Sequence, residues 1–307
     1  MEEHALPRAA LKLVLDQITP LILTYNEESN LERTLHQLTW AKDIVIVDSF
    51  SDDDTLSIAS RFSNTRIYQR PFDSHQNQWT FGLKETNINT PWVLALDADY
   101  ILTEEFISEL GMLQPGPQVN GYTAQFIYCL NGKRLRSGVY PSVDVLYRAD
   151  KATYEQDGHT HRVDIEGGKG LLHSKILHDD RKPLRRWFLS QVNYAELEAK
   201  KLRSSHPDSL SFADRIRTWR VIAPPAVLFY CLVIRGGLFD GWPGVFYAFQ
   251  RMFAELLLSL HLLDSNPTVK EASSSDSRAI PHGRATASSP ETKESSDLDS
   301  GALAANK

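Results

Sequence analysis

The chain has 307 residues, a formal net charge of −6 and two cysteines, Cys129 and Cys231. This acidic balance argues against a general nucleic-acid-binding protein, and two cysteines are too few for a disulfide framework, as expected in a reducing cytoplasm. The N-terminal MEEHALPRAALKLVLD is unlike a secretory signal, and no uncharged apolar run reaches the roughly 18 residues of a membrane-spanning helix. We therefore expect a soluble or peripheral protein.

From residue 20 onward, apolar runs alternate with amphipathic segments. The run 20–25 (PLILTY) predicts a first strand, and Leu31, Leu35 and Leu38 recur at helical spacing after it. Strands that alternate with helices predict an α/β fold with a mainly parallel sheet and right-handed crossovers. The next predicted elements are a strand at 43–48, a helix at 56–62, a strand at 66–69, a helix around Trp79 and Leu83, and a strand at 92–97.

Three of these predicted strands end in polar residues. The first runs into Thr24-Tyr25-Asn26-Glu27, the second ends at Asp48, and the fourth ends at Asp97-Ala98-Asp99. Each alone is explained by a turn or by an acid at a helix start. Together they predict a ligand site, because the carboxyl ends of parallel strands share one edge, and paired carboxylates suit a divalent cation shared with phosphates. No Gly-x-Gly-x-x-Gly or Walker sequence supports a dinucleotide or P-loop enzyme.

The segments LILTYNEESNL, AKDIVIVDSFSDDDT and PWVLALDADY resemble the family 2 glycosyltransferases of the GT-A fold. The resemblance is strong over 20–113 and weaker to about residue 263, and it is similar to the branch that builds lipopolysaccharide cores and exopolysaccharides. It implies that Thr24, Tyr25, Glu27 and Asp48 hold the nucleoside of a nucleotide-diphosphate sugar, most simply a UDP-sugar. It also implies that Asp97 and Asp99 meet Mg²⁺ or Mn²⁺ and the donor diphosphate.

Two positions depart from the resemblance. Many relatives carry a cation and an asparagine where this chain has Trp79 and Thr80, so a phosphate-side cation is either absent or supplied elsewhere. Relatives often have Val-His-Glu where this chain has His161 followed by Arg162. We therefore expect the catalytic base to be Asp157 or His161, with His159 as a rival. A zinc site or a polar surface loop remains an alternative for these histidines.

The second half of the chain predicts an acceptor-binding region followed by helices. Basic residues recur from Lys175 to Arg220, and the apolar helix 245–263 carries one polar stripe of Arg251, Glu255 and Ser259. Such a helix beside basic residues suits an anionic membrane surface. The alternatives are a solvated surface for the basic residues and a core or dimer helix for 245–263. The tail lacks aromatic residues and is expected to be disordered. The predicted segments are an N-terminal extension 1–19, a nucleotide-sugar-binding half 20–113, an acceptor or catalytic half 114–180, a helical, membrane-apposed region 181–263, and the tail 264–307.

The resemblance implies an inverting glycosyltransferase that moves a sugar to a hydroxyl of a glycan or a lipid-linked acceptor, in bacterial cell-surface polysaccharide synthesis. The acceptor proton must go to a base, and the metal offsets charge on the leaving group. We expect a cytoplasmic protein, peripheral on the inner face of the cytoplasmic membrane. The alternatives are a sugar nucleotidyltransferase, and a non-catalytic nucleotide-sugar-binding or membrane scaffold protein.

Overall fold

The computed structural model describes residues 15–157, 160–206, 210 and 212–264. The predicted disordered tail, apart from Asp264, and most of the predicted N-terminal extension lie outside these residues. These described residues belong to one compact unit. Among the helices that can be described, none combines the length and the apolar character that crossing a membrane requires.

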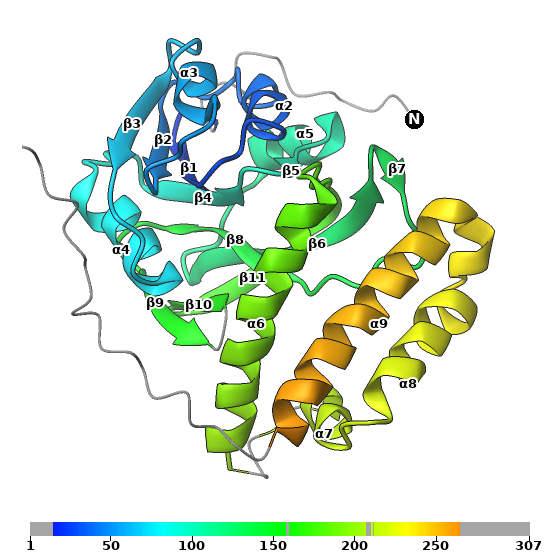
Figure 1. The fold of residues 1–307 in the computed structure, drawn as a ribbon. Helices are drawn as coiled ribbons and strands as arrows, with labels where there is room; N and C mark the ends of the chain where they lie inside the picture. The colour runs from blue at the N-terminus through cyan, green and yellow to red at the C-terminus, as the bar shows by residue number, and fades with distance from the viewer. Residues whose placement is uncertain (1–14, 158–159, 207–209, 211, 265–307) are drawn as a thin grey trace, which may run out of the picture. The chain divides into compact units, whose positions relative to one another are not determined.

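The N-terminal half alternates strands and helices as predicted (Figure 1). Three of its strands, with the sequences ITPLILT, IVIVD and WVLALD, are apolar and buried on both faces, as a parallel sheet covered by helices requires. The elements are β1 (Ile18–Thr24), α2 (Leu31–His36), β2 (Ile44–Asp48), α3 (Thr55–Ala59), β3 (Thr65–Gln69), α4 (His75–Glu85) and β4 (Trp92–Asp97).

The middle of the chain is mostly strand, rich in Tyr, Val, Ile and Phe. A nine-stranded sheet has the order β3-β2-β1-β4-β8-β6-β11-β5, with β7 paired to β6, while β9 and β10 form a separate hairpin. Strands from both sides of residue 113 therefore lie in one sheet. The added elements are β5 (Tyr100–Ile101), α5 (Glu104–Met112), β6 (Val119–Leu130), β7 (Lys133–Arg134), β8 (Val143–Arg148), β9 (Ala152–Asp157), β10 (Thr160–Ile165) and β11 (Gly168–His178).

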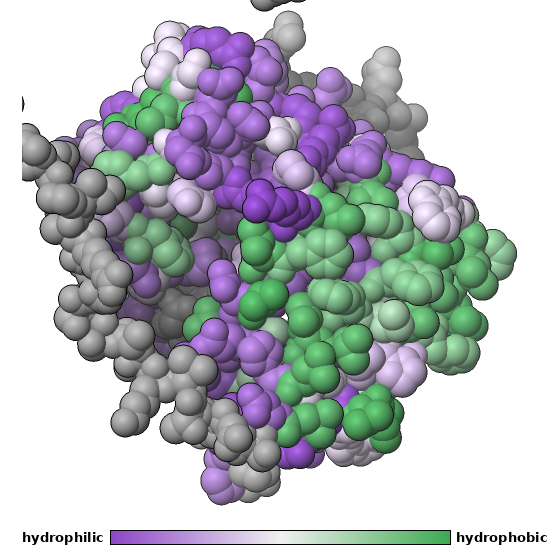
Figure 2. Space-filling view, viewed as in Figure 1, coloured by the Kyte–Doolittle hydropathy of each residue, from purple (hydrophilic) through white to green (hydrophobic). Residues whose placement is uncertain are grey.

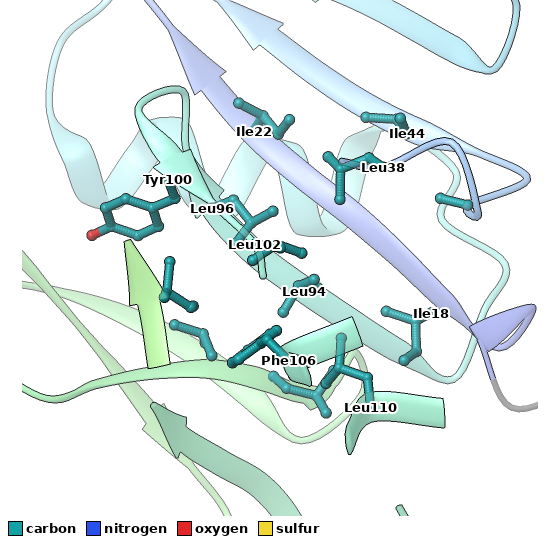
Figure 3. Packing of buried hydrophobic residues seen from close by; sticks show 14 of the residues in the cluster. Ile18, Ile22, Leu38, Ile44, Leu94, Leu96, Tyr100, Leu102, Phe106 and Leu110 are labelled. Carbon is teal, nitrogen blue, oxygen red and sulfur yellow. The ribbon is translucent and has the colours of Figure 1, made fainter. Parts of the chain in front are cut away.

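The main hydrophobic core lies between this sheet and helices α2 and α5. Figure 3 shows Leu94 and Leu96 of β4 in one cluster of buried side chains with Phe106 and Leu110 of α5. Ile22 of β1 belongs to the same cluster. These side chains are almost entirely removed from water, and each contributes roughly 1.5–3 kcal/mol of burial free energy. Such packing holds the carboxyl ends of β1 and β4 in fixed positions, which is what a reaction site needs.

The C-terminal part is helical, as predicted. Helix α9 packs against α6 and against α8 (Figure 1). A short π-helix, η2, and a short 3₁₀ helix, η3, connect α8 to α9. The elements are α6 (Leu184–Ser204), α7 (Phe212–Thr218), α8 (Ala223–Phe229), η2 (Tyr230–Ile234), η3 (Gly237–Asp240) and α9 (Trp242–Leu263). Figure 2 shows hydrophobic residues gathered over α8 and α9, whereas the N-terminal α/β part is mostly hydrophilic.

The predicted polar stripe of α9 faces inward. Glu255 and Ser259 are only 6% and 4% exposed, and Arg217 of α7 pairs with Glu255 at 3.1 Å. The apolar side of the helix faces outward instead, with Phe249 51% exposed. Phe253 is an exception, because it packs against Trp187 and Phe188 of α6. The helix therefore exposes Phe249, Leu256 and Leu260, whereas Tyr247 and Leu258 are buried against its neighbours.

Candidate active site

Parallel pairing of β1, β2 and β4 gathers the predicted polar strand ends at one edge of the sheet. Thr24 lies opposite Asp48 across the β1–β2 pair, and Leu23 lies opposite Asp97 across the β1–β4 pair. Because β2 lies on one side of β1 and β4 on the other, the strand order reverses at β1. Ligands of doubly wound sheets bind outside the carboxyl ends of the strands at such a point.

Asp99 lies in the turn between β4 and β5 and is held there by a histidine. Strand β5 pairs with β11, so that Tyr100 lies opposite His178, and His178 Nε2 comes within 3.1 Å of Asp99 Oδ2. Burial disfavours the charged forms, but mutual attraction outweighs it: the pKa of Asp99 is held at about 2 and the pKa of His178 is raised. The contact therefore favours the charged forms of both side chains.

Asp97 lacks such a partner of its own. Burial, together with repulsion from Asp99, raises the pKa of Asp97 to about 6, while Tyr100 and the charges of His178 and Lys182 act in the opposite direction. A carboxylate with this pKa is poised to lose its proton when a further positive charge arrives. The two carboxylates thus differ in character, although one residue separates them.

Glu27 and Lys182 form a buried ion pair at the same edge. Lys182 Nζ lies 2.6 Å from Glu27 Oε1, and the Asn30 amide donates to Glu27 Oε2 at 3.0 Å. Burial raises the pKa of Glu27 to about 7 against the attraction of Lys182, and Asp99 adds to the rise. Burial lowers the pKa of Lys182, but attraction to Glu27 and then to Asp99 outweighs it and raises that pKa. Lys182 therefore acts electrostatically on both acidic clusters.

Two further contacts tie residues 27–33 to the end of β11. Arg33 pairs with Asp179 at 2.8 Å, and the Asn30 amide donates to Asp180 Oδ1 at 2.9 Å. Asp179 is itself buried, and its Oδ1 accepts a hydrogen bond from the Gly132 amide at 2.8 Å. Because each side chain has several partners, the edge is rigid before any ligand arrives.

Asp48 organises the other end of the edge. It is fully buried, and its carboxylate accepts hydrogen bonds from Thr24 Oγ1 at 2.9 Å and from the Ser51 amide at 2.8 Å. The Gln69 amide adds a weaker contact at 3.4 Å. Asp48 thus shapes the loop that follows β2, and a direct contact with a nucleoside base stays a prediction.

Two aromatic side chains near this end are exposed. Arg186 lies over the Tyr25 ring at 5.3 Å from its centroid and donates to the backbone carbonyls of Tyr25 and Asn26. Phe50 has a φ of +61°, a left-handed conformation that is strained for a bulky side chain. Such strain tends to be kept where a ligand is bound.

Asp97 and Asp99 fit a divalent cation. Asp99 Oδ1 is buried and has no hydrogen-bond partner among the described atoms, which leaves a carboxylate oxygen available for coordination. Across the described residues, no three His, Cys, Asp or Glu side chains are grouped to hold a metal. The protein would thus supply two carboxylates, and phosphate or water oxygens would complete the shell, as is common for Mg²⁺.

The predicted catalytic base cannot be placed from side-chain geometry. Asp157 ends β9, and His161 lies in β10 opposite Gln156 in the hairpin. The side chains of Asp157 and His161, and all of His159, lie outside what the structure describes. Their role stays a prediction.

The departure at Trp79 has a structural explanation. Trp79 is buried and stacks on Tyr154 of β9 with ring centroids 5.6 Å apart, so this position fastens the β9–β10 hairpin to α4. Positive charge reaches the edge from Lys182 and Arg186 instead. The positively charged side chains at this edge therefore belong to a segment about one hundred residues later in the chain than Trp79.

The residues that sequence reasoning missed form one run, His178-Asp179-Asp180-Arg181-Lys182. The basic residues of this region were interpreted as a solvated or membrane-facing surface, which is wrong for Lys182 and for Arg217, since both are in internal ion pairs. The available signal was the pattern itself, because five consecutive ionisable residues directly after an apolar strand resemble the other acidic strand ends.

Several known proteins are similar to this chain. LpsC of Rhizobium meliloti (strain 1021), a lipopolysaccharide core biosynthesis glycosyltransferase, is 25% identical over 284 residues, which cover 83% of this chain and 97% of LpsC. The solved structure of S. aureus TarS 1–349 in complex with UDP-GlcNAc is 14% identical, covers 78% of this chain and 81% of that chain, and has a TM-score of 0.38. For glucosyl-3-phosphoglycerate synthase from Mycobacterium tuberculosis the identity is 15%, the coverage 68% and 88%, and the TM-score 0.41.

The family model for glycosyl transferase family 2 matches residues 21–174, half of the chain. The matched segment begins in β1, includes Asp48, Asp97 and Asp99, and ends within β11. It thus contains the polar strand ends that form the edge described above. The chain belongs to glycosyl transferase family 2.

Proposed function

We propose that this glycosyltransferase takes its sugar from a nucleotide-diphosphate donor, first among them a UDP-sugar, and transfers it with inversion to an acceptor hydroxyl. The observation that carries the proposal is the placement of two carboxyl groups, Asp97 and Asp99, within electrostatic reach of Lys182 at the edge where the strand order reverses. A bound metal ion and a fixed positive charge would together stabilise the negative charge that develops on a leaving diphosphate.

In this proposal the donor lies along the edge, with its nucleoside toward Thr24, Tyr25, Glu27 and Asp48. Asp48 and Thr24 shape the loop beside the base, and Glu27 holds Lys182 near the diphosphate. Because these groups are already hydrogen-bonded or paired, little reorganisation is required during the reaction.

Asp97 and Asp99 would hold Mg²⁺ or Mn²⁺. A cation there supplies charge stabilisation to the diphosphate as it leaves. His178 keeps Asp99 ionised and oriented through the 3.1 Å contact. In an inverting reaction the acceptor oxygen attacks the sugar from the side opposite the diphosphate, and Asp157 or His161 would take the hydroxyl proton.

The direct test is nucleotide-sugar hydrolysis and transfer by the purified protein with a panel of UDP-, GDP- and dTDP-sugars, with and without Mn²⁺. We expect turnover with one nucleotide class, strongest with Mn²⁺. Absence of both binding and turnover across the panel would contradict a catalytic role and would favour the non-catalytic alternative.

Donor binding should depend on pH in a direction set by Asp97. Its pKa of about 6 in the free protein means that it must release a proton when a cation binds, so affinity for UDP with Mn²⁺ should fall as the pH is lowered through about 6. Calorimetry in two buffers of different ionisation enthalpy measures the proton release. Without Mn²⁺, binding of UDP should release no proton from Asp97. Equal proton release with and without the metal would contradict the assignment.

For the acceptor, the similarity to a lipopolysaccharide-core enzyme and the shape of the C-terminal helices both favour a lipid-linked glycan. The segment from the end of α7 to the start of α9 exposes large apolar side chains, among them Trp219, Phe239 and Trp242. Figure 2 shows hydrophobic residues gathered over α8 and α9. Burial against lipid would stabilise each by roughly 1.5–3 kcal/mol. We therefore place the protein on the inner face of the cytoplasmic membrane, acting in cell-surface polysaccharide synthesis.

Membrane association should depend on side chains that the structure shows to be exposed. Phe239→Glu, Phe249→Glu and Trp242→Glu together should release the protein from phosphatidylglycerol-containing vesicles in a flotation assay, because each places a charge where lipid would lie. Phe253→Glu is a matched contrast, since Phe253 packs against α6 and its replacement should lower the unfolding midpoint. Unchanged vesicle binding by the triple variant would contradict membrane apposition.

A further inference from the structure

A strongly basic cavity of about 510 Å³ lies where the β6–β7 turn meets η3. Five cationic side chains line it, and one acidic side chain, Asp240, does so. An adjoining cavity of about 340 Å³ shares Lys175 and Arg235 with it and extends to Tyr140. We call the two together the basic cavity. Its five cations are Lys133, Arg134, Arg136, Lys175 and Arg235.

The five positive charges that line this cavity outnumber its one negative charge, Asp240. Asp240 is 4% exposed, and its carboxylate is occupied by the amide and hydroxyl of Ser137, each at 2.9 Å. Lys133 and Arg235 donate only to backbone carbonyls, at 2.8 Å and 3.1 Å. In the part of the chain that the structure describes, none of the five cations forms a salt bridge. Like charges gathered around a hollow attract an anion with more than one charge.

The cavity borders the reaction edge on the side away from the nucleoside end. Tyr140 and Tyr128, which line it, pack on His178 with ring centroids 4.5 Å and 4.9 Å apart, and His178 in turn contacts Asp99. In the sheet, β6 and β11 lie on one side of β4, whereas β1 and β2 lie on the other. The rings of Tyr128, Tyr140 and His178 therefore lie between the basic cavity and Asp99.

The outer rim of the cavity is apolar and exposed. Phe239 lines the cavity and is 82% exposed, and Leu238 and Trp242 beside it are 60% and 76% exposed. A ligand that fits both surfaces has a multiply charged anionic part and apolar chains next to it. A free sugar phosphate would leave the apolar rim in water, and an uncharged glycolipid would leave the cations unpaired.

We propose that the basic cavity binds the phosphate groups of a phosphorylated glycolipid, and that this glycolipid is the acceptor. The inference rests on the proposed function, which it deepens by assigning the acceptor's charge and its place. The phosphates lie among the five cations, the acyl chains lie over Phe239 and Trp242, and the saccharide reaches past Tyr140 toward Asp99. Arginine guanidinium groups suit this ligand, because they form bidentate hydrogen bonds with phosphate oxygens.

The test is flotation of the full chain with three kinds of phosphatidylcholine vesicle. One kind carries a synthetic diphosphorylated disaccharide lipid, the second carries the same lipid without phosphate, and the third carries phosphatidylglycerol at equal surface charge. We expect the wild-type protein to bind the first kind at least about tenfold more tightly than the other two.

The variant Arg134→Gln/Arg136→Gln/Lys175→Gln should bind the phosphorylated vesicles roughly 100-fold more weakly, about fivefold for each cation removed. Within the described residues none of these three side chains forms a hydrogen bond or a salt bridge, and the attraction that Glu105 and Asp240 exert on Arg134 and Arg136 is long-range, so the unfolding midpoint should hold. The matched control removes three exposed cations elsewhere, Arg61→Gln/Lys84→Gln/Lys200→Gln, and should bind like the wild type.

Each remaining outcome contradicts the proposal. Equal binding of the glycolipid and phosphatidylglycerol vesicles would show that bilayer phospholipid, and not the acceptor, supplies the phosphate. Equal losses in both triple variants would show a diffuse charge effect without a site. Nucleotide-sugar hydrolysis by the wild-type protein is measured separately, so that a failure of the proposed glycosyl transfer is distinguishable from a failure of this site.

Discussion

Replacing Asp99 with asparagine is expected to lower glycosyl transfer by roughly 10²–10³-fold while the protein stays folded. Asp99 has one buried oxygen without a hydrogen-bond partner among the described atoms, and the other contacts His178 at 3.1 Å. Asparagine keeps the shape of the turn but removes the charge that is proposed to hold a cation and that raises the pKa of His178. Steady-state transfer rates and the affinity for UDP with Mn²⁺ would measure the loss.

Asp150→Asn is the matched control for this experiment. It makes the same chemical change, but at an exposed residue away from the edge. It should transfer at the wild-type rate. Full activity in Asp99→Asn, or undiminished transfer by the wild-type protein in excess EDTA, would remove the assignment of Asp97 and Asp99 to a metal ion. A loss of activity accompanied by unfolding would instead identify Asp99 as a structural residue.

Lys182→Met is expected to have two large effects. It should lower the free energy of unfolding by about 3–5 kcal/mol, because Glu27 then lies buried without its partner and must take up a proton. It should also lower transfer by roughly 10²-fold, because the fixed positive charge near Asp99 is lost. Chemical denaturation and transfer assays measure the two effects independently.

The double variant Lys182→Met/Glu27→Gln separates stability from catalysis. Removing both charges should restore most of the stability, because no ion is left buried without a partner, yet transfer should stay low. Lys200→Met is the matched control, since Lys200 pairs with Glu196 on an exposed helix face and contributes at most about 1 kcal/mol. If the double variant regained wild-type transfer, Lys182 would be a structural partner of Glu27 and nothing more.

Much of the fold could be predicted, because its signals are local. Apolar runs such as WVLALD predict buried strands from composition alone, and the residue after each run falls at the strand's carboxyl end. Thr24, Asp48 and Asp97 therefore came together as predicted, since parallel pairing needs only strand order to align their ends.

The other half of the site could not be predicted, because it depends on contacts between distant segments. His178 meets Asp99 only because the two-residue strand β5 pairs with β11, and so short a strand leaves almost no pattern in the sequence. Lys182 meets Glu27 across more than 150 residues of chain. Neither pairing follows from hydrophobic periodicity or from the spacing of a motif.

Helix α9 shows a related limit. Its periodicity correctly predicts one polar stripe, but periodicity does not say which side faces the protein. The inward orientation depends on Arg217, which belongs to another helix and pairs with Glu255. A polar stripe is normally assigned to water, and here a buried ion pair reverses that assignment.

The ties between residues 27–33 and 178–182 bear on how such an enzyme could be altered by recombination. The family match ends at residue 174, just before the segment that pairs with Glu27, Asn30 and Arg33. A chimaera joined at that apparent border would carry a donor-binding half and an incoming segment that had not been selected to fit each other's charges. Exchange of acceptor specificity between relatives is therefore best attempted with a crossover beyond Lys182, so that both ion pairs are inherited together.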